Sequence, residues 1–210
     1  MANNYVTSTD TFSDVSEGSF STSDYPMMEN IVAVTSRLID REFGRWDGFF
    51  YPSTDDVTYY DDGSGETEQE IDEFVSITSV SVSEQGGYAS TDYTTWTLNT
   101  DYLVYPYNYS TQGKPIHKLL ITDYNNAKGA FHTGQRSIKV VGIAGYSTTP
   151  PDLVLQACKL QSIRWFMRAK QGWQDTGAND ELGSREYKGM AELDPDVRAM
   201  LWGLKLELQR

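Results

Sequence analysis

The chain has 210 residues, 39% of them hydrophobic, so it can form one domain with extensions or two small domains with a sizeable core. Its net charge of −13 excludes a protein that grips nucleic-acid phosphates, because such proteins present a basic patch. The acidic excess lies in residues 1–75, which carry 17 acidic and 3 basic side chains. The single cysteine, Cys158, allows no internal disulfide, and no apolar stretch is long enough to span a bilayer.

The first part of the chain predicts a flexible segment followed by a helix. Residues 1–24 are rich in Ser, Thr and Asp and show no hydrophobic period, so we expect a flexible N-terminal arm. Residues 26–43 then predict a helix, with Pro26 in its first turn and Gly44 after its end. Its apolar stripe, expected to pack on the helix that follows Pro151, consists of Met27, Ile31, Val34 and Leu38.

The next segment, residues 45–73, predicts a loop-rich region with one short strand at residues 57–60. Acidic residues between Asp61 and Glu73 do not follow the EF-hand order of calcium ligands, so they predict a solvated loop. Four aromatic residues are interpreted as a satellite core under this loop: Trp46, Phe49, Phe50 and Tyr51.

Short β-forming segments separated by turns fill residues 74–145. They predict an antiparallel meander with strands at residues 74–82, 94–98, 102–105, 116–122 and 138–144. The tyrosines of this region are interpreted as cover for a small sheet or an interface, with a sugar-binding face as the alternative. They are Tyr88, Tyr93, Tyr102, Tyr105, Tyr107 and Tyr109.

A strand and a long helix adjoin near residue 150. Gly142 and Gly145 predict a bulge or a close backbone approach at the end of the strand. The run Thr149-Pro150-Pro151-Asp152 predicts a helix start, because Thr can cap, Pro fits the first turn and Asp complements the helix dipole. The helix over residues 150–170 is apolar on more than one side, so we expect another subunit to cover its second side.

The C-terminal part predicts a long loop and a last helix. Residues 171–193 contain four glycines and are interpreted as a loop that is ordered by assembly. Asp194 as the cap and Pro195 at the first position predict a helix over residues 194–208. Its one-sided stripe suits folding back on its own domain and docking in a partner's groove equally well. The stripe consists of Val197, Met200, Leu201, Leu204 and Leu208.

Several of these features resemble the head–tail connector (adaptor) proteins of tailed bacteriophages. The resemblance extends from Met27 to Leu206. It is carried by the strand that ends in Gly142-Ile143-Ala144-Gly145-Tyr146, by Pro150-Pro151-Asp152, by the helix with Ala157-Cys158, and by Leu193-Asp194-Pro195-Asp196-Val197.

The resemblance implies an α+β fold: a helical core of about three helices with a small antiparallel β subdomain inserted between the first and second helices. The arm at residues 1–24 would precede a connector domain over residues 25–210. That domain would consist of the first helix and loop (25–56), the β insertion (57–146), the main helix (150–171), the long loop (172–193) and a portal-docking helix (194–210).

The resemblance also implies the function of a structural virion protein. About twelve copies would form a ring in the phage neck, between the portal protein and the tail or a second neck protein (stopper or tail terminator). The ring would extend a channel through which DNA passes without sequence-specific binding. The protein would be made in the host bacterial cytoplasm, contact no membrane and need no cofactor or metal.

The candidate partner-binding residues are Arg164, Arg168, Trp173, Tyr187, Val197, Met200, Leu201, Leu204 and Leu208. For the two arginines, the favoured interpretation is a contribution to helix dipole and solubility.

No catalytic motif is present, and Cys158 is expected to be an inert core thiol, so we expect no enzyme. One alternative is a β-rich carbohydrate-binding or tail-fibre-like module. Another is a hydrolase with paired acids, one of which would have to titrate near neutrality.

Overall fold

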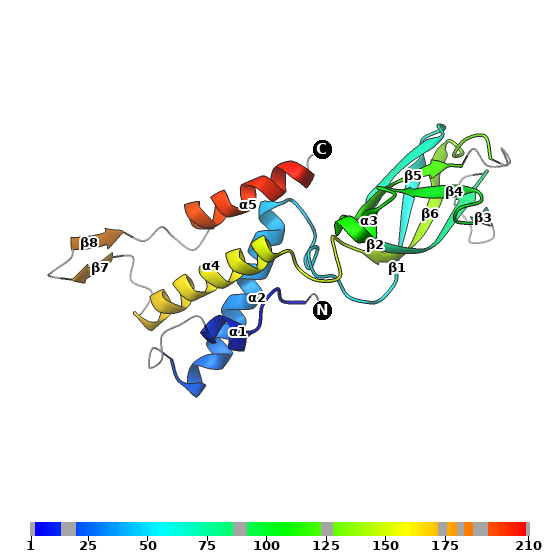
Figure 1. Cartoon of the computed structure of the whole chain (residues 1–210). Helices are drawn as coiled ribbons and strands as arrows, with labels where there is room; N and C mark the ends of the chain where they lie inside the picture. Colours follow the sequence, from blue (N-terminus) through cyan, green and yellow to red (C-terminus); the bar gives the residue numbers. More distant parts are fainter. Residues whose placement is uncertain are drawn as a thin grey trace. The chain divides into compact units, whose positions relative to one another are not determined.

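The computed structural model describes residues 3–13, 20–85, 92–122, 128–171, 176–179, 183–186 and 193–208. The chain forms two compact units, drawn in Figure 1. Residues 51–149 form one, which we call the sheet unit, and residues 2–50 and 150–210 form the other, which we call the helical unit. The sheet unit is therefore inserted between two halves of the helical unit.

The sheet unit is built on six antiparallel strands in the spatial order β1-β6-β2-β5-β4, with β3 also paired to β2. The meander expected for residues 74–145 is therefore wrong, because β2, the first strand of that segment, pairs with β6, its last. The strands are β1 (Val57–Gly63), β2 (Glu68–Ser83), β3 (Tyr93–Trp96), β4 (Tyr102–Tyr105), β5 (Ile116–Ile121) and β6 (Gly134–Ala144). A short helix, α3 (Tyr109–Gln112), lies between β4 and β5.

Strand β2 begins inside the acidic run that was expected to be a solvated loop. Glu68 and Glu70 are exposed, whereas the alternating residues Gln69 and Ile71 are buried. This period of two is that of a half-buried strand, and the acidic side chains occupy its solvent face. The prediction of a loop was wrong because the charge of this run obscured its alternation.

Strand β6 holds the core of the sheet unit. Its buried residues alternate along the strand, and Ile138 and Val140 are inaccessible to solvent. Gly142 provides the expected close approach, because a Cβ there would lie 2.2 Å from the backbone oxygen of Ser76 on β2. A side chain at this position would force two paired strands apart.

In the helical unit, two long helices that are distant in sequence pack against each other. Helix α2 (Tyr25–Glu42) packs against α4 (Asp152–Lys170), as expected, and Figure 1 shows the pair. The Lys170 ammonium lies 3.0 Å from the Asp24 carboxylate, so the end of α4 meets the start of α2. The pair is therefore antiparallel.

The buried face of α2 is rotated from the predicted stripe. Val34 is 54% exposed, whereas Val32, Thr35 and Ile39 are buried. Small polar residues face α4 instead, and the Ser36 hydroxyl lies 3.6 Å from the Cys158 thiol. At the start of α4 the cap also differs, since Pro151 occupies the N-cap position and no side chain caps the helix.

The N-terminal segment is packed onto the helical unit where the structure describes it. Residues 3–13 include α1 (Ser8–Ser13), whose Phe12 is buried and lies 5.1 Å from the Phe166 ring of α4. The Tyr5 hydroxyl donates a hydrogen bond to the buried Asp40 carboxylate, which also accepts one from the Gly48 N–H. The prediction of a flexible arm is therefore wrong for these residues, because their scattered aromatic side chains bury enough area to order them.

The remaining elements are a short helix η1 (Thr22–Asp24), a two-stranded hairpin of β7 (Thr176–Asn179) and β8 (Gly183–Glu186), and the last helix α5 (Pro195–Leu208). The hairpin lies within the stretch that was expected to be a loop. The described residues thus contain five α-helices and a large sheet with a core of its own. This corrects the expected fold class, in which a small β subdomain was inserted in a core of three helices.

One carboxyl group of the sheet unit is held in an unfavourable environment. Burial, reinforced by the nearby Asp72 and Asp62 carboxylates, raises the pKa of Asp61 to about 6. Its Oδ2 atom is enclosed and has no hydrogen-bond partner among the described residues. The ionised carboxylate is therefore tolerated at a cost to the stability of the sheet.

We predict that Asp61→Asn raises the free energy of unfolding of the sheet unit at pH 7–8 by about 1 kcal/mol, a value discounted because the group is half exposed. Since the folded pKa lies above the unfolded one, the native state holds the proton more tightly, and stability falls as pH rises between about 4 and 6. Urea unfolding at several pH values should show the difference shrinking toward pH 4. The exposed Asp56→Asn is the control; an equal gain there would contradict this explanation.

Candidate interaction surface

Helix α4 has a buried face that forms the centre of the helical unit. Val154, Ala157, Cys158 and Phe166 are inaccessible to solvent and face α2, α1 or α5. Burial raises the pKa of the Cys158 thiol to about 11, so it stays protonated and unreactive at neutral pH, as expected of a core thiol. This face is fully covered by the protein's own chain.

A second apolar face of α4 points to solvent. Leu153, Leu160 and Met167 recur at intervals of seven residues, and Ile163 lies between the last two. Leu153 is 46% and Met167 is 40% exposed, and the other two are partly exposed. Seven residues are almost two turns, so the four side chains form one row, which we call the α4 seam.

The predicted stripe of α5 is turned inward. Val197 and Leu201 are fully buried, Leu204 is 7% exposed, and Met200 and Leu208 are partly buried. The sequence was equally compatible with a stripe that folds back on its own domain and with a stripe that docks in a partner's groove. In the structure, the stripe packs against α4 of its own unit. Val197, Leu201 and Leu204 are thus core residues in the monomer, and the stripe is not a free docking surface.

The opposite side of α5 is exposed and also apolar. We call Ala199, Trp202, Gly203 and Leu206 the α5 outer face; Trp202 is 56% and Leu206 is 45% exposed. Gly203 lowers helix stability by about 1 kcal/mol relative to alanine. A Cβ there would meet nothing within 4 Å, so the described residues give no reason for a glycine. This face was missed in the sequence because the stripe on the opposite side of the same helix is more strongly apolar, and only that stripe was considered.

Ion pairs hold α5 in place. The Arg164 guanidinium of α4 binds Asp194 at 3.0 Å and also binds Asp196, at the start of α5. These bonds raise the pKa of Arg164 and lower the pKa of Asp196 to about 2. On the other side of α5, Lys205 lies 3.0 Å from Glu42 of α2. Arg164, a candidate for contacting a partner, is therefore engaged within its own chain.

Three further candidate residues are placed as follows. Arg168 is buried, with 7% of its surface exposed, because it lies on the inner side of α4. Trp173 and Tyr187 lie outside the described residues. Of the nine candidates, the structure thus brings Arg164 together with α5 and turns the helix stripe inward, with Val197, Leu201 and Leu204 buried.

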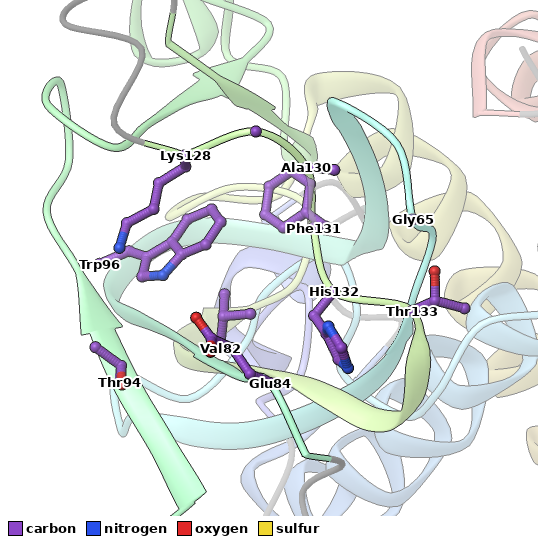
Figure 2. A pocket seen from close by; sticks show the side chains of 11 residues that line it. Gly65, Val82, Glu84, Thr94, Trp96, Lys128, Ala130, Phe131, His132 and Thr133 are labelled. Carbon is purple, nitrogen blue, oxygen red and sulfur yellow. The ribbon is translucent and has the colours of Figure 1, made fainter.

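A pocket of about 560 Å³ lies in the sheet unit, shown in Figure 2. Its lining includes Trp96, which stacks on Phe131 at 5.2 Å, while the Lys128 ammonium lies 5.3 Å from the indole. Figure 2 shows Trp96 between these two side chains. The indole therefore offers no free aromatic face on which a sugar ring could stack.

The tyrosines of the sheet unit do not form a single platform. Tyr102 is buried, Tyr105 packs against Tyr107 and His117, and Tyr93 lies 6.0 Å from Tyr60 on another strand. Tyr88 lies outside the described residues. Tyr105 and Tyr107 are 40% and 62% exposed, so sheet cover, the interpretation that the sequence favoured over a sugar-binding face, describes only some of these tyrosines.

Among the described residues, the pKa of the Asp61 carboxyl is raised to about 6, and a carboxyl that titrates near neutrality was the condition for a hydrolase. Asp61 lies on a strand of the sheet and outside the lining of the pocket, and burial beside Asp72 explains its pKa. Among the described residues, no group of three His, Cys, Asp or Glu side chains is placed to hold a metal ion. Nor does any helix in that part of the chain have the length and apolar character needed to cross a bilayer.

No known family model matches this chain, and a search of curated proteins finds no match either.

We predict that Arg164→Met loosens α5 without unfolding α4. Removing the guanidinium leaves Asp194 and Asp196 without their cation, so amides of residues 195–208 should exchange with deuterium roughly five-fold faster at pH 7. The depressed pKa of Asp196 means that the contribution is present above about pH 4 and is lost as pH falls toward 2. Arg41→Met, on the exposed side of α2, is the control and should leave α5 exchange unchanged.

Proposed function

We propose that this protein is a structural adaptor of a tailed-phage neck, in which copies form a closed ring between the portal protein and the tail or a second neck protein. The observation that carries the proposal is the α4 seam. Leu153 and Met167 remain 46% and 40% exposed after the helical unit has completed its own core. An apolar row with heptad spacing is the pattern that another helix covers.

The helical unit presents more than one apolar surface, and this suits a ring. The α4 seam and the α5 outer face lie on different helices of the same compact unit. We assign the α4 seam to the contact between copies, which is head-to-tail and closes into a ring when the rotation between copies is right, and this leaves the α5 outer face for a different partner. The resemblance to connector proteins suggests about twelve copies.

The contact with the portal is assigned to the α5 outer face in place of the inward stripe. Ion pairs from Arg164 and Lys205 keep α5 on its own unit, so the helix docks as part of that unit and does not detach. Trp202 supplies a large exposed anchor of the kind that dominates binding energy in interfaces. Gly203 beside it leaves room for a close approach by the partner's backbone.

The charge of the chain agrees with a passage for DNA. A net charge of −13 gives the ring a predominantly acidic surface, which repels the phosphates of duplex DNA. DNA can then slide through the channel without being gripped. The proposal places the protein in the virion neck and assigns it no chemical reaction.

We expect the wild-type protein to form rings, alone or on a portal ring, and Leu153→Glu/Met167→Glu to remain monomeric. Two buried carboxylates without partners would each cost several kcal/mol at the interface. Native mass spectrometry measures the outcome. Thr58→Glu/Thr78→Glu adds the same charges to exposed strand positions and should leave the ring intact. A wild-type protein that stays monomeric and ignores the portal ring overturns the proposal.

For the portal contact, we predict that Trp202→Ala weakens binding to a portal ring at least about thirty-fold, as expected for a central aromatic anchor worth 2 kcal/mol or more. Trp202→Phe should retain most of the affinity because the ring still fills its site. Surface plasmon resonance on immobilised portal gives the dissociation constants. If Trp202→Ala binds as well as the wild type, the α5 outer face is not the portal contact.

A further inference from the structure

The β7–β8 hairpin belongs to the helical unit, but its contacts within the described structure do not explain what holds it there. Its strands pair with each other from Thr176↔Glu186 to Asn179↔Gly183 and form a separate two-stranded sheet. Its only extensive contacts in the described structure are between these two strands. A lone two-stranded hairpin is marginally stable in water, so this element needs a partner.

The connection that carries the hairpin is longer than its path requires. Helix α4 ends at Lys170, and the Asp194 N–H donates a hydrogen bond of 2.9 Å to the Gln161 side chain, earlier on α4. Gln161 lies about 14 Å back along the helix axis from Lys170, at 1.5 Å per residue. An extended chain covers that distance with about five residues. The connection has 22 residues between Gln171 and Asp194, so most of it serves something other than the return.

The composition of the hairpin indicates how it meets its partner. Its strands read Thr-Gly-Ala-Asn and Gly-Ser-Arg-Glu and contain no large apolar residue. Such strands cannot bury an apolar face in a groove. Their cohesive groups are the backbone N–H and C=O groups along the two outer edges, which pair with other strands.

Two open edges of the large sheet, those of β1 and β4, carry protective features that β7 lacks. Strand β1 carries Asp61 and a bulge between Asp61 and Gly63, and β4 is followed by Pro106. Charges, bulges and prolines at an edge discourage pairing with other strands. Strand β7 has neither a charge nor a proline, whereas β8 carries one residue of each sign, Arg185 and Glu186.

We propose that the β7–β8 hairpin pairs, edge to edge, with the hairpins of neighbouring copies. This inference rests on the proposed ring. Rotation about the ring axis keeps all hairpins pointing the same way, so β8 of one copy runs antiparallel to β7 of the next. Each copy has two different edges, β7 and β8, and the ring uses both. The hairpins then form one closed band of antiparallel strands, which leaves no free edge.

Hydrogen–deuterium exchange on the wild-type protein, before and after ring formation, tests this pairing. Edge pairing should slow exchange of peptides that cover residues 176–179 and 183–186 at least tenfold in the ring. Ala178→Pro removes one strand N–H, and the ring carrying it should dissociate at a lower urea concentration. Thr95→Pro, which removes an N–H from β3 of the large sheet, is the control for a general effect of proline on strands.

The outcomes separate this inference from the proposed function. Rings that form while the hairpin peptides exchange as fast as in the monomer overturn the hairpin pairing and leave the ring standing. Protection that appears only when a portal ring is added shows that the hairpin pairs with the portal, which also overturns pairing between copies. If no ring forms under any condition, the proposed function fails first.

Discussion

Helix α4 has two apolar faces, and the described part of the chain covers only one of them. Its inner face is enclosed by α2, α1 and α5, and Val154, Ala157 and Phe166 are inaccessible to solvent there. The row that contains Leu153 and Met167 is left facing water. The hydrophobic effect penalises such exposure in proportion to the exposed apolar area. Covering the α4 seam with another protein surface would therefore be favourable. The proposed ring follows from this imbalance.

The way α5 is held shapes what the helical unit can offer to partners. Its larger apolar stripe is used inside the unit, and Arg164 and Lys205 bind acidic residues on either side of it. An interface that required α5 to detach would have to break both sets of ion pairs and expose Val197 and Leu201. The unit is therefore suited to binding as a preformed body, with smaller ordering costs than a helix that folds on contact.

Several elements were predictable because local chemistry determined them. The strand at β6, the helices at α2, α4 and α5, and the close approach at Gly142 follow from period, prolines and glycine.

Other features depend on tertiary context. An amphipathic stripe such as that of α5 looks the same whether its own domain or a partner covers it, so its direction could not be read from the sequence. The start of β2 was hidden because Glu68 and Glu70 face solvent beside the buried Gln69 and Ile71. The rotated face of α2 buries Thr35 and Ser36, which hydrophobicity alone does not select.

The insertion of the sheet unit between α2 and α4 sets the order in which the protein can fold during synthesis. Helix α2 leaves the ribosome first, but α4, on which it packs, begins only at Asp152, after the whole sheet unit has been made. The nascent sheet can complete its pairing as soon as β6 emerges, whereas Ile39 and Val32 must wait, uncovered, for translation to pass residue 170.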